Sequence, residues 1–102
     1  MSEYQASNEV ITVEIEGKAY KIRKEISWGE RNRILSRCIT VKPGGAVDVA
    51  WEKLILELAS LCIIEAPFEV TKENLENLKE NIGTELEKYL PITSFRGPEL
   101  SR

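Results

Sequence analysis

The chain has 102 residues, of which 42% are hydrophobic and 30% charged, with a formal net charge of −3. This length fits one domain, and this balance is typical of a globular chain rather than a disordered one. The longest apolar stretch, residues 54–64, falls short of the roughly 20 residues that a membrane span needs. The sequence therefore predicts a soluble domain and not a membrane protein.

The N-terminal part predicts a β-hairpin. Residues 1–8 are polar, lack the pattern of a secretion signal, and are expected to form a flexible lead-in. Apolar and polar residues then alternate over residues 11–16 and 20–23, which is the period of a half-buried strand, with a turn at Gly17-Lys18. The expected apolar face consists of Ile11, Val13, Ile15, Tyr20 and Ile22.

A first helix is predicted from about Trp28 to about Thr40. Ser27 and Glu30 have the spacing of a capping box, in which each side chain accepts from the other residue's backbone amide. Residues 42–45 contain a proline and two glycines, so a mobile loop should follow the helix. The apolar side of the helix would hold Ile34, Leu35, Cys38 and Ile39.

A second helix is predicted from a cap at Asp48 to about Glu65. Its broad apolar stripe comprises Trp51, Leu54, Ile55, Leu58, Ala59, Leu61 and Cys62. Leu56 and Ile63 fall outside this stripe. Two interpretations stay open for them: the hairpin or another helix covers both, or they form a self-association seam.

Two shorter helices should complete the domain. Pro67 ends the second helix, and Thr71 caps a third that presents Leu75, Leu78 and Ile82. Gly83 suits the left-handed position after a helix end. The spacing of Thr84 and Glu87 is that of another capping box, which predicts a fourth helix that buries Leu86 and Leu90.

These elements predict an α+β fold, with an N-terminal β-hairpin packed on a bundle of three to four α-helices. Residues 1–90 would form the single domain. Residues 91–102 contain two prolines and a glycine and are expected to be a flexible C-terminal tail. Phe95 and Arg96 are the tail residues expected to contact a neighbouring molecule, although a tail without a role is an equal alternative.

The residue inventory argues against catalysis. Without histidine, the chain lacks the commonest general base near neutral pH, and two cysteines alone cannot complete a tetrahedral zinc site. No phosphate-binding glycine motif is present. Cys38 and Cys62 lie in apolar helical patterns and are expected to be small buried side chains in a reducing compartment. We therefore expect no enzyme, no catalytic residue, no cofactor and no metal.

Charge is unevenly distributed along the chain. Residues 18–42 hold eight lysines and arginines against two glutamates, a balance of 8 − 2 = +6, so the remaining residues total −9. This segment could solubilise the apolar faces, bind an acidic protein partner through Arg23, Arg33 and Arg37, or, as the weakest alternative, contact nucleic acid phosphates. Arg31 falls within the apolar arc of the first helix, which favours a structural role.

The order of these features resembles the tail assembly chaperones of long-tailed bacteriophages and proviruses. A hairpin ending in residues 17–23 leads to a helix opened by residues 27–32. A variable loop and a long apolar helix closing in residues 65–67 follow, and then Leu75, Leu78, Gly83 and Leu86. The resemblance spans roughly residues 10–90, and no single motif in it is diagnostic.

The resemblance implies a non-enzymatic factor of the host cytoplasm that is absent from the mature virion. Such chaperones coat the tape measure protein, help to recruit tail tube subunits and tend to form homo-oligomers. The family has no motif that fixes its contact residues. Leu56, Ile63, Phe68, Phe95 and Leu100 are the apolar residues that we expect to stay partly exposed for such contacts.

Two other functions compete with this one. A small nucleic-acid-associated regulator would use the basic segment 18–42, although the acidic chain and the absence of expected stacking aromatics speak against it. A structural head-to-tail or tail component would remain in the virion.

Overall fold

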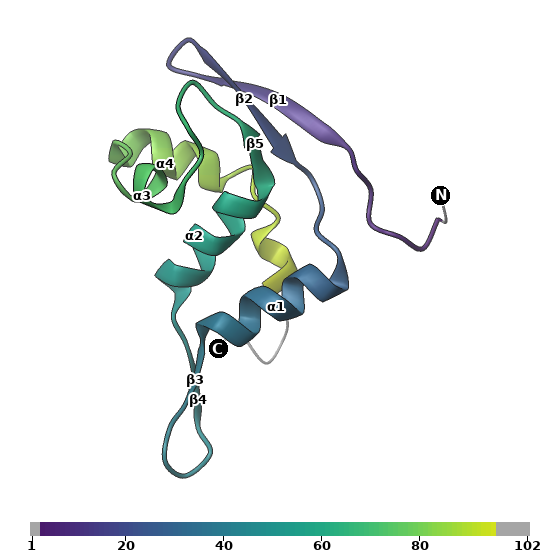
Figure 1. The fold of residues 1–102 in the computed structure, drawn as a ribbon, viewed down its shortest axis with the longest axis vertical. Helices are drawn as coiled ribbons and strands as arrows, with labels where there is room; N and C mark the ends of the chain where they lie inside the picture. The colour runs from purple at the N-terminus through teal and green to yellow at the C-terminus, as the bar shows by residue number, and fades with distance from the viewer. Residues whose placement is uncertain (1–2, 96–102) are drawn as a thin grey trace.

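The computed structural model describes residues 3–95, which form the α+β fold that the sequence predicts (Figure 1). An antiparallel hairpin and a short third strand make one sheet, in the order β1-β2-β5, and a second hairpin stands apart from it. The elements are β1 (Val10–Ile15), β2 (Lys18–Arg23), α1 (Trp28–Cys38), β3 (Ile39–Val41), β4 (Val47–Val49), α2 (Trp51–Cys62), β5 (Ile63–Glu65), α3 (Lys72–Glu76), α4 (Glu80–Glu87) and the 3-10 helix η1 (Ile92–Phe95).

The β1–β2 hairpin forms as predicted, but its turn lies one residue earlier than Gly17-Lys18, because Lys18 already pairs with Ile15 in β2. Glu16 and Gly17, with φ of 51° and 77°, form a two-residue turn whose left-handed residues match the twist of the strands. Ile15, Tyr20 and Ile22 are buried, and Ile11 and Val13 are half-buried against the core. The apolar face of the hairpin therefore packs on the helices, as its alternation indicated.

Helix α2 lies at the centre of the fold and continues directly into a strand. Leu54, Leu58 and Cys62 have no exposed surface. The prediction that this helix reaches Glu65 is wrong, because the β-branched Ile63 and Ile64 favour extended backbone and β5 pairs antiparallel with β2. Ile63 lies opposite Ile22 and is 3% exposed, so the sheet covers it and it is not an exposed seam residue.

A second hairpin replaces the predicted mobile loop. The two glycines at 44 and 45 take positive φ, and the Lys42 amide donates to the Ala46 carbonyl at 2.7 Å. Asp48 therefore lies in β4 and does not cap α2; its carboxylate pairs with Lys42 at 3.2 Å. Figure 1 shows this β3–β4 hairpin projecting from the end of the molecule opposite the β1–β2 hairpin.

The last helices differ from the prediction in their boundaries. Thr71 caps α3 as expected, accepting from the Asn74 amide at 3.1 Å, but α3 ends at Glu76. The amides of Ile82 and Gly83 both donate to the Lys79 carbonyl, so α4 has already begun at Glu80. Gly83 and Thr84 are consequently inside this helix and are neither its C-terminal glycine nor an N-cap.

The packed core extends beyond the expected boundary at residue 90. Ile92 and Phe95 of η1 are buried, and Phe95 has no exposed surface, so its expected role as an exposed contact residue is wrong. Burying a side chain of this size stabilises by roughly 1.5–3 kcal/mol, which favours docking of η1 on the core. The Arg31 guanidinium lies 6.0 Å from the centre of the Phe95 ring, which gives Arg31 a structural contact. Arg96 and Leu100 lie outside the described residues.

The predicted capping box at the start of α1 forms, and its Glu30 also connects the β1–β2 hairpin to this helix. Ser27 accepts from the Glu30 amide at 3.1 Å, and Glu30 accepts from the Ser27 amide at 2.9 Å. The Arg23 guanidinium donates to both Glu30 oxygens, at 3.0 and 3.1 Å. The Arg23 hydrogen bonds, assisted by the Ser27 amide, lower the pKa of Glu30 to about 2.

One carboxylate is buried in the core. Glu57 is 5% exposed and accepts from Arg37 Nη1 at 2.7 Å and from Lys72 Nζ, so it connects α2 to α1 and α3. The hydrogen bond from Lys72 lowers the pKa of Glu57; burial opposes this shift and the Arg37 contact adds to it. Glu57 is therefore charged at neutral pH, and its two cations stabilise it inside the fold.

The first prediction concerns acid unfolding. Because the pKa of Glu30 is lowered in the folded state, its contribution is complete above the unfolded-state value near 4.5 and is lost as the pH falls toward 2. Glu30→Gln should remove a contribution on the order of 2–3 kcal/mol at pH 7 and flatten the pH dependence between those values. Urea unfolding at several pH values measures this. Glu14→Gln, on the exposed face of β1, is the control; the same pH dependence in both variants would contradict the assignment.

The second prediction concerns Glu57. Glu57→Gln keeps the shape of the side chain but removes its charge, so the hydrogen bonds to Arg37 and Lys72 weaken. The free energy of unfolding should fall by about 1–3 kcal/mol, measured by urea denaturation. Glu52→Gln changes an exposed carboxylate of the same helix and should stay within about 0.5 kcal/mol of the parent. Equal stability of the two variants would show that the Glu57 contacts add nothing.

Candidate functional site

An apolar pocket of about 440 Å³ opens between α2 and the α3–α4 segment. Its apolar lining is supplied mainly by leucine, and we call it the leucine pocket. The lining side chains are those of Ile55, Leu56, Ala59, Ile63, Leu75, Leu78, Leu86 and Leu90, with Gly83 in the wall and Glu52, Lys53, Glu76 and Glu87 as its charged members. Because the lining is mostly apolar, we take this pocket as the candidate site.

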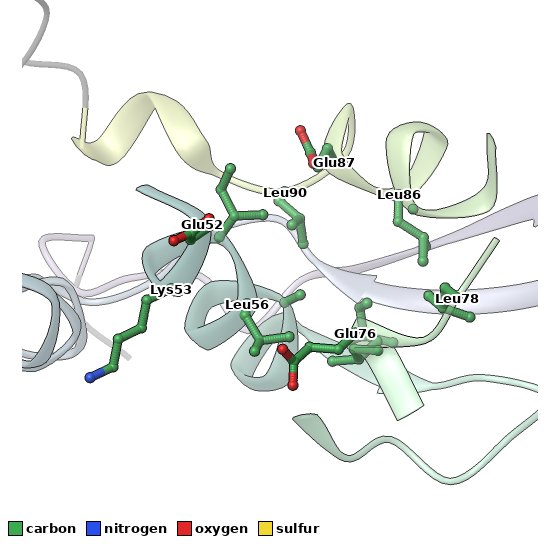
Figure 2. Close-up of a pocket in the computed structure, with 13 residues that line it drawn as sticks. Glu52, Lys53, Leu56, Glu76, Leu78, Leu86, Glu87 and Leu90 are labelled. Carbon is green, nitrogen blue, oxygen red and sulfur yellow. The ribbon is translucent and has the colours of Figure 1, made fainter. Parts of the chain in front are cut away.

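Two groups of leucines face each other across this pocket (Figure 2). Leu86 and Leu90, four residues apart, form one wall, and Leu56 and Leu78 lie opposite them. Leu86 and Leu90 are buried, whereas Leu56 and Leu78 are only half-buried. The fold thus leaves apolar side chains of α2 and of the segment after α3 in contact with solvent.

Gly83 keeps one part of the wall open. It lies within α4, and a Cβ atom added to it would meet no other atom within 4 Å. Glycine in a helix interior lowers helix stability by roughly 0.5–1 kcal/mol relative to alanine. No packing contact requires glycine at position 83, so a larger side chain there would extend into the pocket without displacing the core.

The predicted contact residues do not form one surface. Leu56 and Ile63 both line the leucine pocket, Ile63 as a buried residue. Arg23 and Arg37 are held by Glu30 and Glu57, while Arg33 is exposed on α1. Sequence reasoning named Leu56 and the leucines of the last helices separately, but no pattern in the sequence indicated that they share a pocket.

The basic segment is largely neutralised inside the fold. Apart from the Arg23–Glu30 pair, its ion pairs use carboxylates from outside residues 18–42: Lys21–Glu65, Lys24–Glu9, Arg37–Glu57 and Lys42–Asp48. Except for Arg37–Glu57, whose carboxylate is buried, these pairs are exposed and contribute at most about 1 kcal/mol each. Their consequence is electrostatic, since they reduce the positive potential that an acidic partner or a nucleic acid would meet.

Other exposed apolar residues lie away from the pocket. Trp28 is 79% exposed at the first position of α1. Val41 and Val47 face each other in the β3–β4 register and are both exposed. These side chains give the molecule two further exposed apolar groups, but the hollow that Trp28 lines is mostly polar, unlike the leucine pocket.

Neither cysteine is an activated nucleophile. Both are buried and free, and burial raises the pKa of the Cys62 thiol to about 11 and also raises that of Cys38. The thiols are therefore protonated at neutral pH. Within residues 3–95, no group of three or more carboxylate or thiol side chains is placed to hold a metal ion.

Within the part of the chain that the structure describes, none of the helices has the length and apolar character that crossing a membrane requires. The comparisons with known proteins identify no relative: no family model, curated protein or solved structure matches this chain.

Proposed function

We propose that this chain is a non-enzymatic binding protein that holds a helical segment of another protein in the leucine pocket, in the role of a phage or provirus tail assembly chaperone. The observation that carries the proposal is the pocket itself, in which Ile55, Leu56 and Leu78 stay partly exposed to solvent after the chain has folded. In this role the client is the tape measure protein, and the chaperone also recruits tail tube subunits.

The shape of the pocket suits a helix. An amphipathic helix binds a groove through apolar residues spaced three, four and seven apart along one face. Two leucine-lined walls, from α2 and from the α3–α4 segment, leave space for such a row of side chains between them. A long helical protein in the cytoplasm needs its apolar stripe covered until it assembles, and this pocket would cover part of it.

Association between copies of the chain is a second part of the proposal. Since Ile63 is buried, the self-association seam that Leu56 and Ile63 offered as one interpretation is replaced by two described surfaces. These are the outer edge of β1, which pairs with no strand in the described structure, and the exposed valines of the β3–β4 hairpin. Both lie away from the leucine pocket, so a homo-oligomer would keep its pockets open. The protein would act in the host cytoplasm and leave before the virion is complete.

The competing functions have weaker support. A nucleic-acid regulator needs unpaired cations on one face, and Arg23, Arg37 and Lys42 are all paired with carboxylates. A tail component of the virion needs no open client pocket. Mass spectrometry of mature particles separates these two functions, because a tail component should be found in the particles and a chaperone should be absent from them.

The third prediction tests the pocket with Gly83→Trp. The indole should fill the pocket from α4, so the tape measure protein of the same phage or provirus, co-expressed with this variant, should lose solubility and no longer copurify. Gly83→Ala is the matched control, since it should retain client binding and raise the free energy of unfolding by about 0.5–1 kcal/mol.

Circular dichroism and thermal unfolding would establish that the Gly83→Trp variant is folded. A folded tryptophan variant that still solubilises the client at the level of the alanine variant would contradict the assignment of the pocket.

The fourth prediction separates protein binding from nucleic acid binding. At about 0.15 M salt the purified chain should show no micromolar affinity for duplex or single-stranded nucleic acid, measured by fluorescence anisotropy. Arg33→Ala should leave client solubility unchanged. Micromolar binding that falls steeply with salt and is lost in this variant would favour the regulator instead.

A further inference from the structure

We propose that the helix held in the leucine pocket carries lysine or arginine residues on both sides of its apolar stripe. This inference rests on the proposed function and specifies the chemistry of the client. It follows from three carboxylates that the fold places at the pocket and leaves without a cation.

The three carboxylates come from three different helices or their ends. Glu52 lies in the first turn of α2, Glu76 is the last residue of α3, and Glu87 is the last residue of α4. All three are exposed at the rim of the leucine pocket. In Figure 2 the carboxylate of Glu76 lies beside Leu56, and that of Glu87 lies on the Leu90 side.

In the described part of the chain, these three carboxylates have no cation of their own. Among residues 3–95, the side chains of Glu52, Glu76 and Glu87 make no hydrogen bond or ion pair. Four other carboxylates, those of Glu9, Asp48, Glu65 and Glu85, each pair with a lysine. The fold therefore leaves the acidic charge at the pocket without a pairing lysine or arginine from the described residues, and there this charge borders an apolar surface.

The one cation of the lining does not reverse this charge. Lys53 neighbours Glu52 in α2, and Figure 2 shows its side chain extending away from the leucines. Three carboxylates against one distant ammonium give the pocket a negative rim around an apolar floor. A client helix with acidic flanks would bring like charges together as water leaves the contact, which opposes binding, whereas basic flanks would pair.

The same charges argue against a second copy of this chain as the occupant. Helices α3 and α4 have glutamates on their exposed faces, so they would repel the rim. Helix α1 is the basic helix, but its Ile34 and Cys38 are buried in its own core. The structure thus points to a helix of another protein, with leucine-like residues at the pocket and basic residues beside them.

Two synthetic peptides would test this inference on the full chain. Both have about 18 residues, long enough for a stable helix, and leucines at intervals of three and four. Lysine flanks the stripe in one peptide and glutamate in the other. Fluorescence anisotropy should give about tenfold tighter binding of the lysine peptide than of the glutamate peptide at about 0.1 M salt. Most of this preference should vanish near 1 M salt, because the Debye length falls to about 3 Å there.

Charge reversal at the rim provides the matched comparison. The triple variant Glu52→Lys, Glu76→Lys, Glu87→Lys should prefer the glutamate peptide. The control Glu14→Lys, Glu69→Lys, Glu73→Lys has the same net charge but changes exposed residues that do not line the pocket, so it should keep the parent preference. Thermal unfolding of both variants establishes that they are folded.

The outcomes separate this inference from the proposed function. If both peptides bind the parent equally and Gly83→Trp abolishes both, the pocket binds helices without charge selection and this inference is overturned while the function stands. If neither peptide binds, both fail. If neither binds and the rim reversal alone changes the mass in light scattering, a second copy occupies the pocket, which also overturns the inference.

Discussion

Burial of α2 on several sides is the constraint on which the other elements depend. Leu54, Leu58 and Cys62 are wholly covered, and the helix passes into β5 without a loop. Because β5 pairs with β2, the direction of α2 sets where the β1–β2 sheet lies. Helices α1 and α3 contact α2 directly, and its buried Glu57 is held by one cation from the end of α1 and one from the start of α3.

The distribution of charge follows from this packing. Cations of the hairpin and α1 meet carboxylates that are distant in sequence, as in the pairs Lys21–Glu65 and Arg37–Glu57, so a segment that is strongly basic by composition becomes largely neutral on the surface. The acidic half of the chain has more carboxylates than these cations can pair. Part of the excess lies around the leucine pocket, where an apolar surface and uncompensated charge occur together and select for a particular kind of partner.

Local signals predicted several elements correctly. The alternation of residues 11–15 and 20–22 fixed the faces of the hairpin, and the hydrogen bonds of Ser27 with Glu30 form the expected capping box. Failures occurred where a long-range contact competed with a local preference. Ile63 left the helix to pair with β2, Asp48 entered a strand instead of capping α2, and Phe95 joined the core although its neighbours suggested a free tail.

The sequence by itself determined the class of fold, the hairpin, the central apolar helix and the absence of histidine chemistry. These depend on periodicity, short-range caps and residue type. Only the tertiary structure decided which apolar residues stay open. Leu56, Leu78 and Leu90 are equally apolar in the sequence, yet Leu90 is buried while Leu56 and Leu78 are half-buried. Their pocket exists because α3 packs on α2 and α4 lies across the pocket from α2, with Gly83 in its wall. Ion-pair partners are likewise a property of the fold, since they join residues that are far apart in the chain.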